Sequence, residues 1–303
     1  MQVLFTERGY RIRILTRKSS SPDPYVETVV GDLGDPSVCE KALDGVNLVV
    51  HAAGEKSDPT KFWSVNFKGT ENLLNAVNNK RIRRFVYISS VGVIGADPLQ
   101  DGLFGESSLC NPPNGYEKSK WEAEKLVLNA GNSMKVAILR PANVFGEHDP
   151  RHGLLTLARN IKKGRFIYTG GQNSQCNYVY VEDVAHAILA LVEHAAAGGR
   201  VYHLSDSCMI GAFVSALADE LGVPRPSVQL SGPLSNLLRI VLRVIIKFPT
   251  VAQSSAVSRL VSLNNRARFA TARLVNELGF KCPVGWRAGL GRIVKWYHEE
   301  GKL

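Results

Sequence analysis

The sequence has little of what disulfide-stapled, zinc-bound or membrane-spanning proteins need. Its five cysteines are odd in number, scattered and without C-x-x-C spacing. That pattern argues against a disulfide framework and a zinc site, and it suits a reducing compartment. No apolar run reaches the ~18 residues of a membrane span, and the N-terminus carries no secretory apolar segment. We therefore expect a cytoplasmic protein with no integral membrane segment and no bound metal.

Internal repeats and low-complexity tracts are lacking as well. The 303 residues, 45% hydrophobic and 21% charged, can bury the core of one domain and a smaller lobe. The net charge of +10 invites a nucleic-acid interpretation. However, the basic residues are dispersed and are not interleaved with aromatic residues. We do not expect nucleic-acid binding, although a few basic side chains can hold an anionic cofactor or substrate.

Apolar periodicity predicts alternating strands and helices in the first half of the chain. This order implies right-handed crossovers and a doubly wound parallel sheet of the α/β class. Beyond Gly146 the pattern loosens into helices at 154–163 and 184–194 and mostly helical material from 231 to 303. The strands are expected at 11–15, 25–30, 47–53, 85–89 and 136–139, and the helices at 66–79 and 116–129.

A tyrosine and a lysine lie one helical turn apart in Tyr116-Glu117-Lys118-Ser119-Lys120. A phenol with a pKa near ~10 is a poor base at neutral pH. A lysine four residues on shares its helix face, and its ammonium favours the phenolate. Ser90, after the preceding strand, can hydrogen-bond a substrate oxygen and stabilise charge that develops there. The spacing predicts an acid/base centre made of Ser90, Tyr116 and Lys120, although a lone Tyr-Lys pair would more often be a solvated helix face.

Several further short motifs follow one another along the chain. They are Ile12–Arg17, Gly31–Leu33, His51–Gly54, Val65–Thr70, Ile88–Val91, Tyr116–Lys120, Leu139–Gly146 and Tyr178–Ala185. In this order and spacing they resemble the extended short-chain dehydrogenase/reductase family, the NAD-dependent epimerase/dehydratase group. The similarity runs from about Arg8 to the C-terminus. Residues 170–173 and 177–181 are also similar to the 3β-hydroxysteroid dehydrogenase branch.

The resemblance implies a Rossmann-like sheet with a small, mostly helical C-terminal lobe. Residues 1–165, with returning segments near 176–207, would form an incomplete dinucleotide-binding domain. Residues 166–175 and 208–303 would form the substrate-binding lobe. The implied activity is an NAD(P)-dependent epimerase, dehydratase or oxidoreductase acting on a sugar nucleotide or a related hydroxyl or carbonyl compound by hydride transfer. A 3β-hydroxysteroid or dihydroflavonol-type dehydrogenase/reductase is the alternative activity, and a homodimer is left open.

The resemblance also implies a set of cofactor contacts. Arg17 and Lys18 replace the acidic residue that would bind a ribose 2′-hydroxyl, and a basic residue there can pair with a 2′-phosphate, which favours NADP over NAD. Asp32 and Leu33 resemble the pair that contacts adenine, although a turn aspartate is the plainer interpretation. The further predicted cofactor residues are Ala52, Ala53, Gly54, Tyr116, Lys120, Pro141, Asn143 and Val144.

The substrate contacts predicted by the same resemblance are Ser90, Val91, Asn143 and Asn177. Asn66 is expected to be structural support, and His51 a packed strand residue. The amphipathic segment Leu234 to Phe248 could be a lid, a membrane-surface helix or a core helix of the lobe, and we favour the core helix.

One expected motif is lacking. Members of the resembled family open with a strand, a glycine-rich turn and a helix, whereas here Met1–Thr6 joins directly to Glu7-Arg8-Gly9. Neighbouring parallel strands need a crossover of a dozen or more residues. We therefore expect residues 1–6 to be a short helix or a displaced extension, with the central strand and the pyrophosphate cradle missing. Either an internal stretch is missing or the true start lies upstream, so a truncated, non-catalytic homologue unable to bind dinucleotide tightly is a further alternative.

Overall fold

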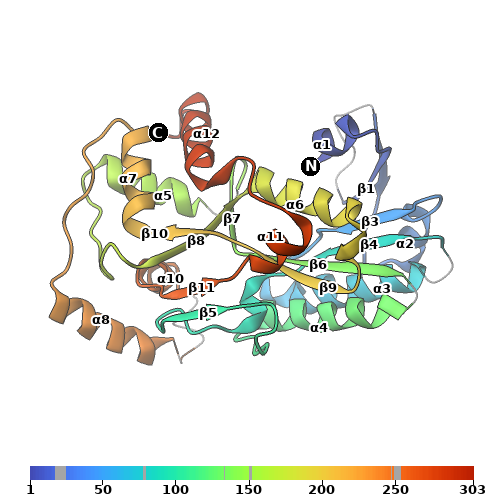
Figure 1. Cartoon of the computed structure of the whole chain (residues 1–303), viewed down its shortest axis with the longest axis horizontal. Helices are drawn as coiled ribbons and strands as arrows, with labels where there is room; N and C mark the ends of the chain where they lie inside the picture. The colour runs from blue at the N-terminus through green and yellow to red at the C-terminus, as the bar shows by residue number, and fades with distance from the viewer. Residues whose placement is uncertain (18–24, 78–79, 133, 150–151, 247, 249–253) are drawn as a thin grey trace.

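The computed structural model describes residues 1–17, 25–77, 80–132, 134–149, 152–246, 248 and 254–303. Its centre is a parallel four-stranded sheet in the order β3-β4-β6-β9 (Figure 1). The predicted parallel α/β architecture is confirmed. The strands are β3 (Leu48–His51), β4 (Arg84–Ile88), β6 (Lys135–Pro141) and β9 (Arg200–Leu204).

Helices cover both faces of this sheet. Phe85 and Ile138 point to the face that packs on α3 (Gly69–Val77) and α4 (Gly115–Asn129). Val86 and Leu139, their chain neighbours, point to the face that packs on α6 (Val181–Glu193). This alternation follows from the two-residue period of a strand, and burial on both faces explains why β4 and β6 are almost continuously apolar.

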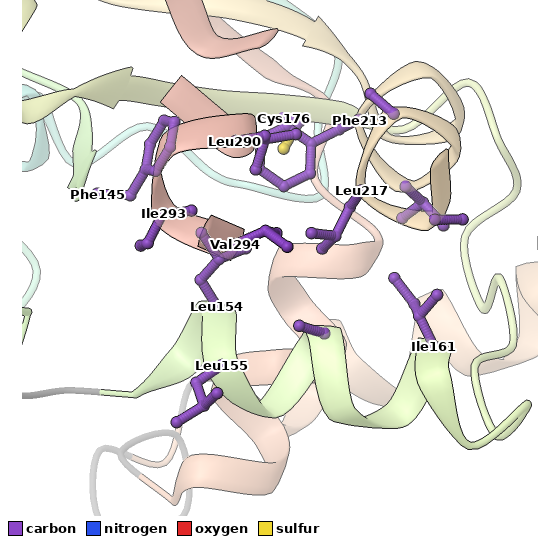
Figure 2. Packing of buried hydrophobic residues seen from close by; sticks show 14 of the residues in the cluster. Phe145, Leu154, Leu155, Ile161, Cys176, Phe213, Leu217, Leu290, Ile293 and Val294 are labelled. Atoms are coloured by element: carbon purple, nitrogen blue, oxygen red, sulfur yellow. The ribbon is translucent and has the colours of Figure 1, made fainter. Parts of the chain in front are cut away.

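The smaller lobe is built around a three-stranded sheet in the order β10-β8-β7. Its core joins α5 (Gly153–Lys162), α7 (Ile210–Glu220) and α12 (Gly285–Glu299), and Figure 2 shows Leu154, Phe213 and Leu290 among the side chains that these helices contribute to it. Helix α5 thus packs in this core, and the predicted division of the chain into two domains stays a prediction. The strands are β7 (Asn143–Phe145), β8 (Gln175–Tyr180) and β10 (Asp206–Met209).

The N-terminal residues form α1 (Gln2–Glu7), so the expected short helix is confirmed. Its buried Phe5 packs on Tyr10 with 5.4 Å between ring centroids. The chain then enters β1 (Ile12–Thr16), which pairs in parallel with β2 (Val26–Val30). These two strands form a sheet of their own and are not hydrogen-bonded to β3.

A cavity of about 910 Å³ separates β1 from β3. It is lined by consecutive residues of both strands, 11–15 and 47–53. Successive side chains of a strand point to opposite faces, so a cavity lined by consecutive residues meets the backbone edge of each strand. All five residues of β1 are only partly buried, although three are Ile or Leu. Within the described residues, β1 and β3 therefore face each other across one gap with strand edges that pair with no other described strand.

The C-terminal third supplies helices around the lobe and the sheet. The helix α8 (Gly232–Ile245) buries only Ser235 and Leu242 and leaves most of its apolar side chains exposed. Our interpretation of this segment as a core helix is wrong, because most of its apolar side chains are exposed and α8 lies at the edge of the molecule (Figure 1). The remaining elements are α2 (Pro36–Ala42), β5 (Gly102–Phe104), α10 (Ser255–Leu263), β11 (Ala267–Phe269) and α11 (Ala272–Leu278).

Candidate active site

Ser90 lies just beyond the carboxyl end of the buried strand β4. It is the N-cap of a single 3₁₀ turn, Val91–Ile94, and its side chain accepts a hydrogen bond from the Gly92 amide at 3.0 Å. Capping by a serine oxygen satisfies an amide that the short turn leaves free. The hydroxyl is therefore held at the edge of the sheet where parallel α/β proteins bind ligands.

Lys120 is buried in α4 and reaches the same edge. Asn114 caps this helix by accepting from the Glu117 amide at 3.0 Å. The Lys120 Nζ donates to the Ile88 carbonyl at 2.5 Å and lies 4.2 Å from the centroid of the Tyr87 ring. Because Ile88 is two residues before Ser90, the lysine nitrogen and the serine share the end of β4.

Burial controls the charge of this lysine. Desolvation lowers the pKa of Lys120 to about 7, against the opposing attraction of Glu124 and Glu117. A group whose pKa lies near the working pH can change protonation state at little cost. Such a lysine can respond to whatever charge is placed beside it.

Tyr116 begins the same helix one turn before Lys120. Its half-buried ring packs edge-on against the Phe62 ring, with 5.7 Å between the ring centroids. The Lys56 Nζ lies 5.5 Å from the centroid of the Tyr116 ring. The helix packs against the 3₁₀ turn that Ser90 caps. Ser90, the first turn of α4 and the Lys120 amine are therefore neighbours, and each is positioned by a regular element.

Glu117 is a member of this cluster that sequence reasoning missed. Its carboxylate lies over Gly92, where a Cβ would be only 2.1 Å from Oε1, so a larger residue at position 92 would displace the Glu117 carboxylate. Burial raises the pKa of Glu117. The charges of Lys56 and Lys120 and a hydrogen bond with Ser90 act in the opposite direction and lower this pKa. One of its oxygens is buried without a hydrogen-bond partner in the described part of the chain. No single-sequence signal pairs a glutamate with a glycine 25 positions earlier.

Two buried polar residues brace α4 from behind. Asn66 accepts from the Glu55 amide at 2.7 Å and donates to the Ser119 hydroxyl at 2.9 Å, so its predicted supporting role is confirmed. His51 is 3% exposed and bonds to the Thr70 hydroxyl at 2.8 Å, as expected of a packed strand residue. These bonds tie β3 and the helix that follows it to α4.

A buried ion pair fixes the neighbouring strand. Arg140 of β6 contacts the Glu124 carboxylate, with 3.1 Å from Nε to each oxygen, and Ser89 donates to the same carboxylate at 2.6 Å. Removing one partner of such a pair typically costs roughly 3–5 kcal/mol. The pair therefore holds α4, β4 and β6 in register around the site.

The predicted cofactor residues occupy two strand ends. Ala52, Ala53 and Gly54 are exposed directly after buried β3, and a Cβ on Gly54 would lie 3.9 Å from the Lys120 Nζ. Pro141 ends β6, and the exposed Asn143 and the half-buried Val144 begin β7.

The residues predicted at the adenosine end lie further off. Arg17 is exposed at the end of β1, and Lys18 lies outside the described residues. Asp32 accepts from the Gly34 amide at 2.7 Å, which makes it a turn aspartate, and Leu33 lines the cavity between β1 and β3. Their roles toward a cofactor stay predictions.

Two predicted substrate residues are enclosed by protein. Val91 is 8% exposed. The Asn177 amide donates to the Ala267 carbonyl at 2.7 Å and accepts from the Ser207 hydroxyl at 2.8 Å. This arrangement gives the predicted substrate contact of Asn177 no support, whereas Asn143 remains accessible.

The residues at the end of β3 and β4 fit the nicotinamide end of a dinucleotide. Small exposed side chains at 52–54 allow close approach, and Lys120 offers a donor beside them. The pyrophosphate end fits less well. Of the helices that flank the cavity, α2 has its first turn capped by the Asp35 carboxylate, and α1 has only six residues. In the described ranges, no group of three or more His, Cys, Asp and Glu side chains could hold a metal ion.

Known proteins of similar sequence are dehydrogenases and epimerases. The chain is 28% identical over 295 residues to 3beta-hydroxysteroid-dehydrogenase/decarboxylase isoform 2 of Arabidopsis thaliana, covering 89% of this chain and 51% of that protein. It therefore spans about half of that relative. It is 27% identical over 297 residues to N-acetyl-alpha-D-glucosaminyl-diphospho-ditrans,octacis-undecaprenol 4-epimerase of Escherichia coli O157:H7. This match covers 95% of this chain and 88% of that epimerase.

Solved structures share the fold. A dTDP-glucose 4,6-dehydratase from Bacillus anthracis in complex with NAD matches with a TM-score of 0.73 at 19% identity, covering 99% of this chain and 92% of that one. RMD from Pseudomonas aeruginosa complexed with NADPH matches with a TM-score of 0.66 at 22% identity, covering 95% and 99%.

A family model joins these sequence and fold similarities. The model described as "NAD dependent epimerase/dehydratase family" matches residues 2–205, well over half of the chain and every residue of the Ser90–Tyr116–Lys120 cluster. The chain therefore belongs to the NAD-dependent epimerase/dehydratase family, whose members are oxidoreductases and epimerases of the extended short-chain dehydrogenase type.

Proposed function

We propose that the chain oxidises a carbinol carbon of its substrate to a carbonyl, or reduces the carbonyl to the carbinol, with Tyr116 as the acid/base. The observation that carries this proposal is the position of the Lys120 amine, bonded to the Ile88 carbonyl two residues before Ser90 and one helical turn from Tyr116. A buried amine at a strand end, beside a phenol and a capped hydroxyl, is typical of proton transfer at a carbinol.

Each residue then has one task. Ser90 donates a hydrogen bond to the substrate oxygen and stabilises negative charge on it. Tyr116 takes the hydroxyl proton during oxidation and returns it during reduction. Lys120, when protonated, favours the phenolate of Tyr116 and donates to the cofactor ribose. A bound nicotinamide dinucleotide supplies the hydride acceptor or donor, and residues 52–54 with Pro141, Asn143 and Val144 would line its site.

The cofactor is NAD or NADP. Arg17 supports NADP, because an exposed guanidinium at the end of β1 can pair with a 2′-phosphate. The substrate we favour is a sugar nucleotide or a related hydroxyl compound, approached through Asn143. A relative of high mutual coverage is named for a 4-epimerase of a sugar carried on undecaprenol diphosphate. A 3β-hydroxysteroid is the second candidate, since other relatives are named for that activity.

Turnover by the Tyr116→Phe variant tests the assignment. Wild type and variant are incubated with NAD or NADP and with panels of UDP-sugars and 3β-hydroxysteroids, and nicotinamide absorbance and product epimers are followed. We expect the variant to lose roughly 10²–10⁴-fold in kcat, the usual contribution of a positioned acid/base. Its circular dichroism should match wild type, because only one hydroxyl is removed.

Retention of most of the activity by Tyr116→Phe would refute the role of Tyr116. Absence of turnover by wild type on every substrate, together with no cofactor binding, would favour the alternative of a non-catalytic homologue.

A further inference from the structure

The helix α8 carries an apolar face that the described protein does not cover. Leu234, Leu237, Ile240 and Val244 are 54%, 57%, 61% and 55% exposed, and Val241 is exposed as well. They recur every three or four residues, so they form one stripe along the helix. A contiguous exposed apolar stripe on a soluble domain commonly marks an interaction surface.

The attachment of α8 to the protein uses the other side of the helix. Leu242 is 1% exposed, and the Arg243 guanidinium donates to the Leu99 carbonyl at 3.2 Å. Leu99 belongs to the segment between Ser90 and Tyr116. The helix is thus attached to the segment between Ser90 and Tyr116, and its apolar stripe is exposed.

The charges of this segment are all of one sign. Residues 232–248 contain three basic and no acidic residues, and the whole chain carries a net charge of +10. By helical spacing, Arg243 lies beside the apolar stripe, whereas Arg239 lies on the opposite side of the helix. A second copy of this chain would bring the same basic flank against it, whereas an anionic surface would complement it.

We propose that α8 lies in the interface of an anionic lipid bilayer, with its apolar stripe among the acyl chains and the exposed Arg243, beside the stripe, near the phosphates. An amphipathic helix with a basic flank and no acidic residue has the features of an interfacial helix. None of the helices in the described residues is long and apolar enough to cross a membrane. This inference does not depend on the proposed reaction.

Vesicle flotation of the full chain tests the proposal. One set of vesicles contains phosphatidylcholine only, and the other contains about a third phosphatidylglycerol. We expect binding to the anionic vesicles, weakened by salt. The triple variant Leu237→Asn/Ile240→Asn/Val244→Asn should bind the anionic vesicles at least about tenfold more weakly than wild type, because it loses three apolar anchors.

A matched triple variant separates α8 from general surface hydrophobicity. Val3, Val30 and Val228 are 67%, 54% and 59% exposed on other elements. Their replacement by Asn should change vesicle binding less than about twofold. All six positions are exposed, so both variants should keep the circular dichroism and melting temperature of wild type.

Three outcomes would overturn the proposal. The first is that wild type does not float with anionic vesicles, and the second is that the α8 triple variant floats as well as wild type. The third is that the substitutions change only the oligomeric state, so that sedimentation velocity shows a dimer for wild type and a monomer for the variant. In a supporting experiment, the fluorescence of the tryptophan introduced by Leu237→Trp is followed. Its emission should shift to the blue on anionic vesicles, and brominated acyl chains should quench it.

Discussion

At the scale of single residues, Lys120 is the most informative side chain of the site. It is 3% exposed, and its amine contacts the Ile88 carbonyl and the face of the Tyr87 ring. The tyrosine–lysine spacing alone predicted the pair, because two residues four apart share a helix face whatever the rest of the fold. Glu117 was missed, because its contact with Gly92 and Ser90 depends on how α4 docks.

The lowered pKa of Lys120 predicts a dependence of stability on pH. The pKa falls from 10.5 to about 7 on folding, so between these values the unfolded chain binds more protons and stability rises with pH. The cost of burying Lys120 is absent above the unfolded pKa and complete below about pH 7. Lys120→Met removes this cost, so it should stabilise the protein more at acidic than at alkaline pH.

Urea unfolding at about pH 6 and about pH 9 measures this effect. The gain in the free energy of unfolding from Lys120→Met should be larger at the lower pH by roughly 2–3 kcal/mol. Lys118→Met on the exposed side of the same helix is the control and should show no such difference. A pH-independent effect of Lys120→Met would mean that the amine is solvated in the folded protein.

At the scale of elements, strong periodicity predicted the sheet well. The strands expected at 11–15, 85–89 and 136–139 are β1, β4 and β6, shifted by at most two residues at either end. The orientation of α8 could not be predicted, since its pattern fits a buried, a covering or a membrane-bound helix equally well. The predicted helix at 66–79 begins instead within a π-helical stretch, Phe62–Lys68, that seats Asn66 against α4.

The gap between β1 and β3 bears on cofactor affinity. We expect a version of the chain with a strand, glycine-rich turn and helix added before Glu7 to bind dinucleotide much more tightly. The added strand can pair with both edges of the 910 Å³ cavity, and the helix N-terminus supplies amides for the pyrophosphate. Each charge-assisted hydrogen bond is worth roughly 1.5–3 kcal/mol, so the affinity should rise by orders of magnitude.

Calorimetric titration of both versions with NAD and NADP checks this expectation. An added segment of the same length made of Gly and Ser is the control and should leave the affinity unchanged. Micromolar binding by the chain as it stands would contradict the expectation and show that another element holds the pyrophosphate.

At the scale of the whole molecule, the sheet and the lobe meet around the same strand ends. β6 runs directly through Pro141 into β7, so the edge that carries Ser90 and Lys120 faces the lobe strand that begins with Asn143. The parallel α/β class and the family followed from motif order, which is fixed by topology. The choice of substrate did not follow from motif order, since it depends on polar groups such as Asn177, whose hydrogen bonds the lobe satisfies internally.

The central claim is that Ser90, Tyr116 and Lys120 form one dinucleotide-dependent acid/base centre. Titration of the purified protein with NADPH, followed by nicotinamide fluorescence, tests it most directly when wild type, Tyr116→Phe and Lys120→Ala are compared. Tyr116→Phe should bind within about twofold of wild type, since only the transferred proton is lost. Lys120→Ala should bind at least about tenfold more weakly, since a charge-assisted donor is lost. Equal binding by Lys120→Ala and wild type would contradict the account.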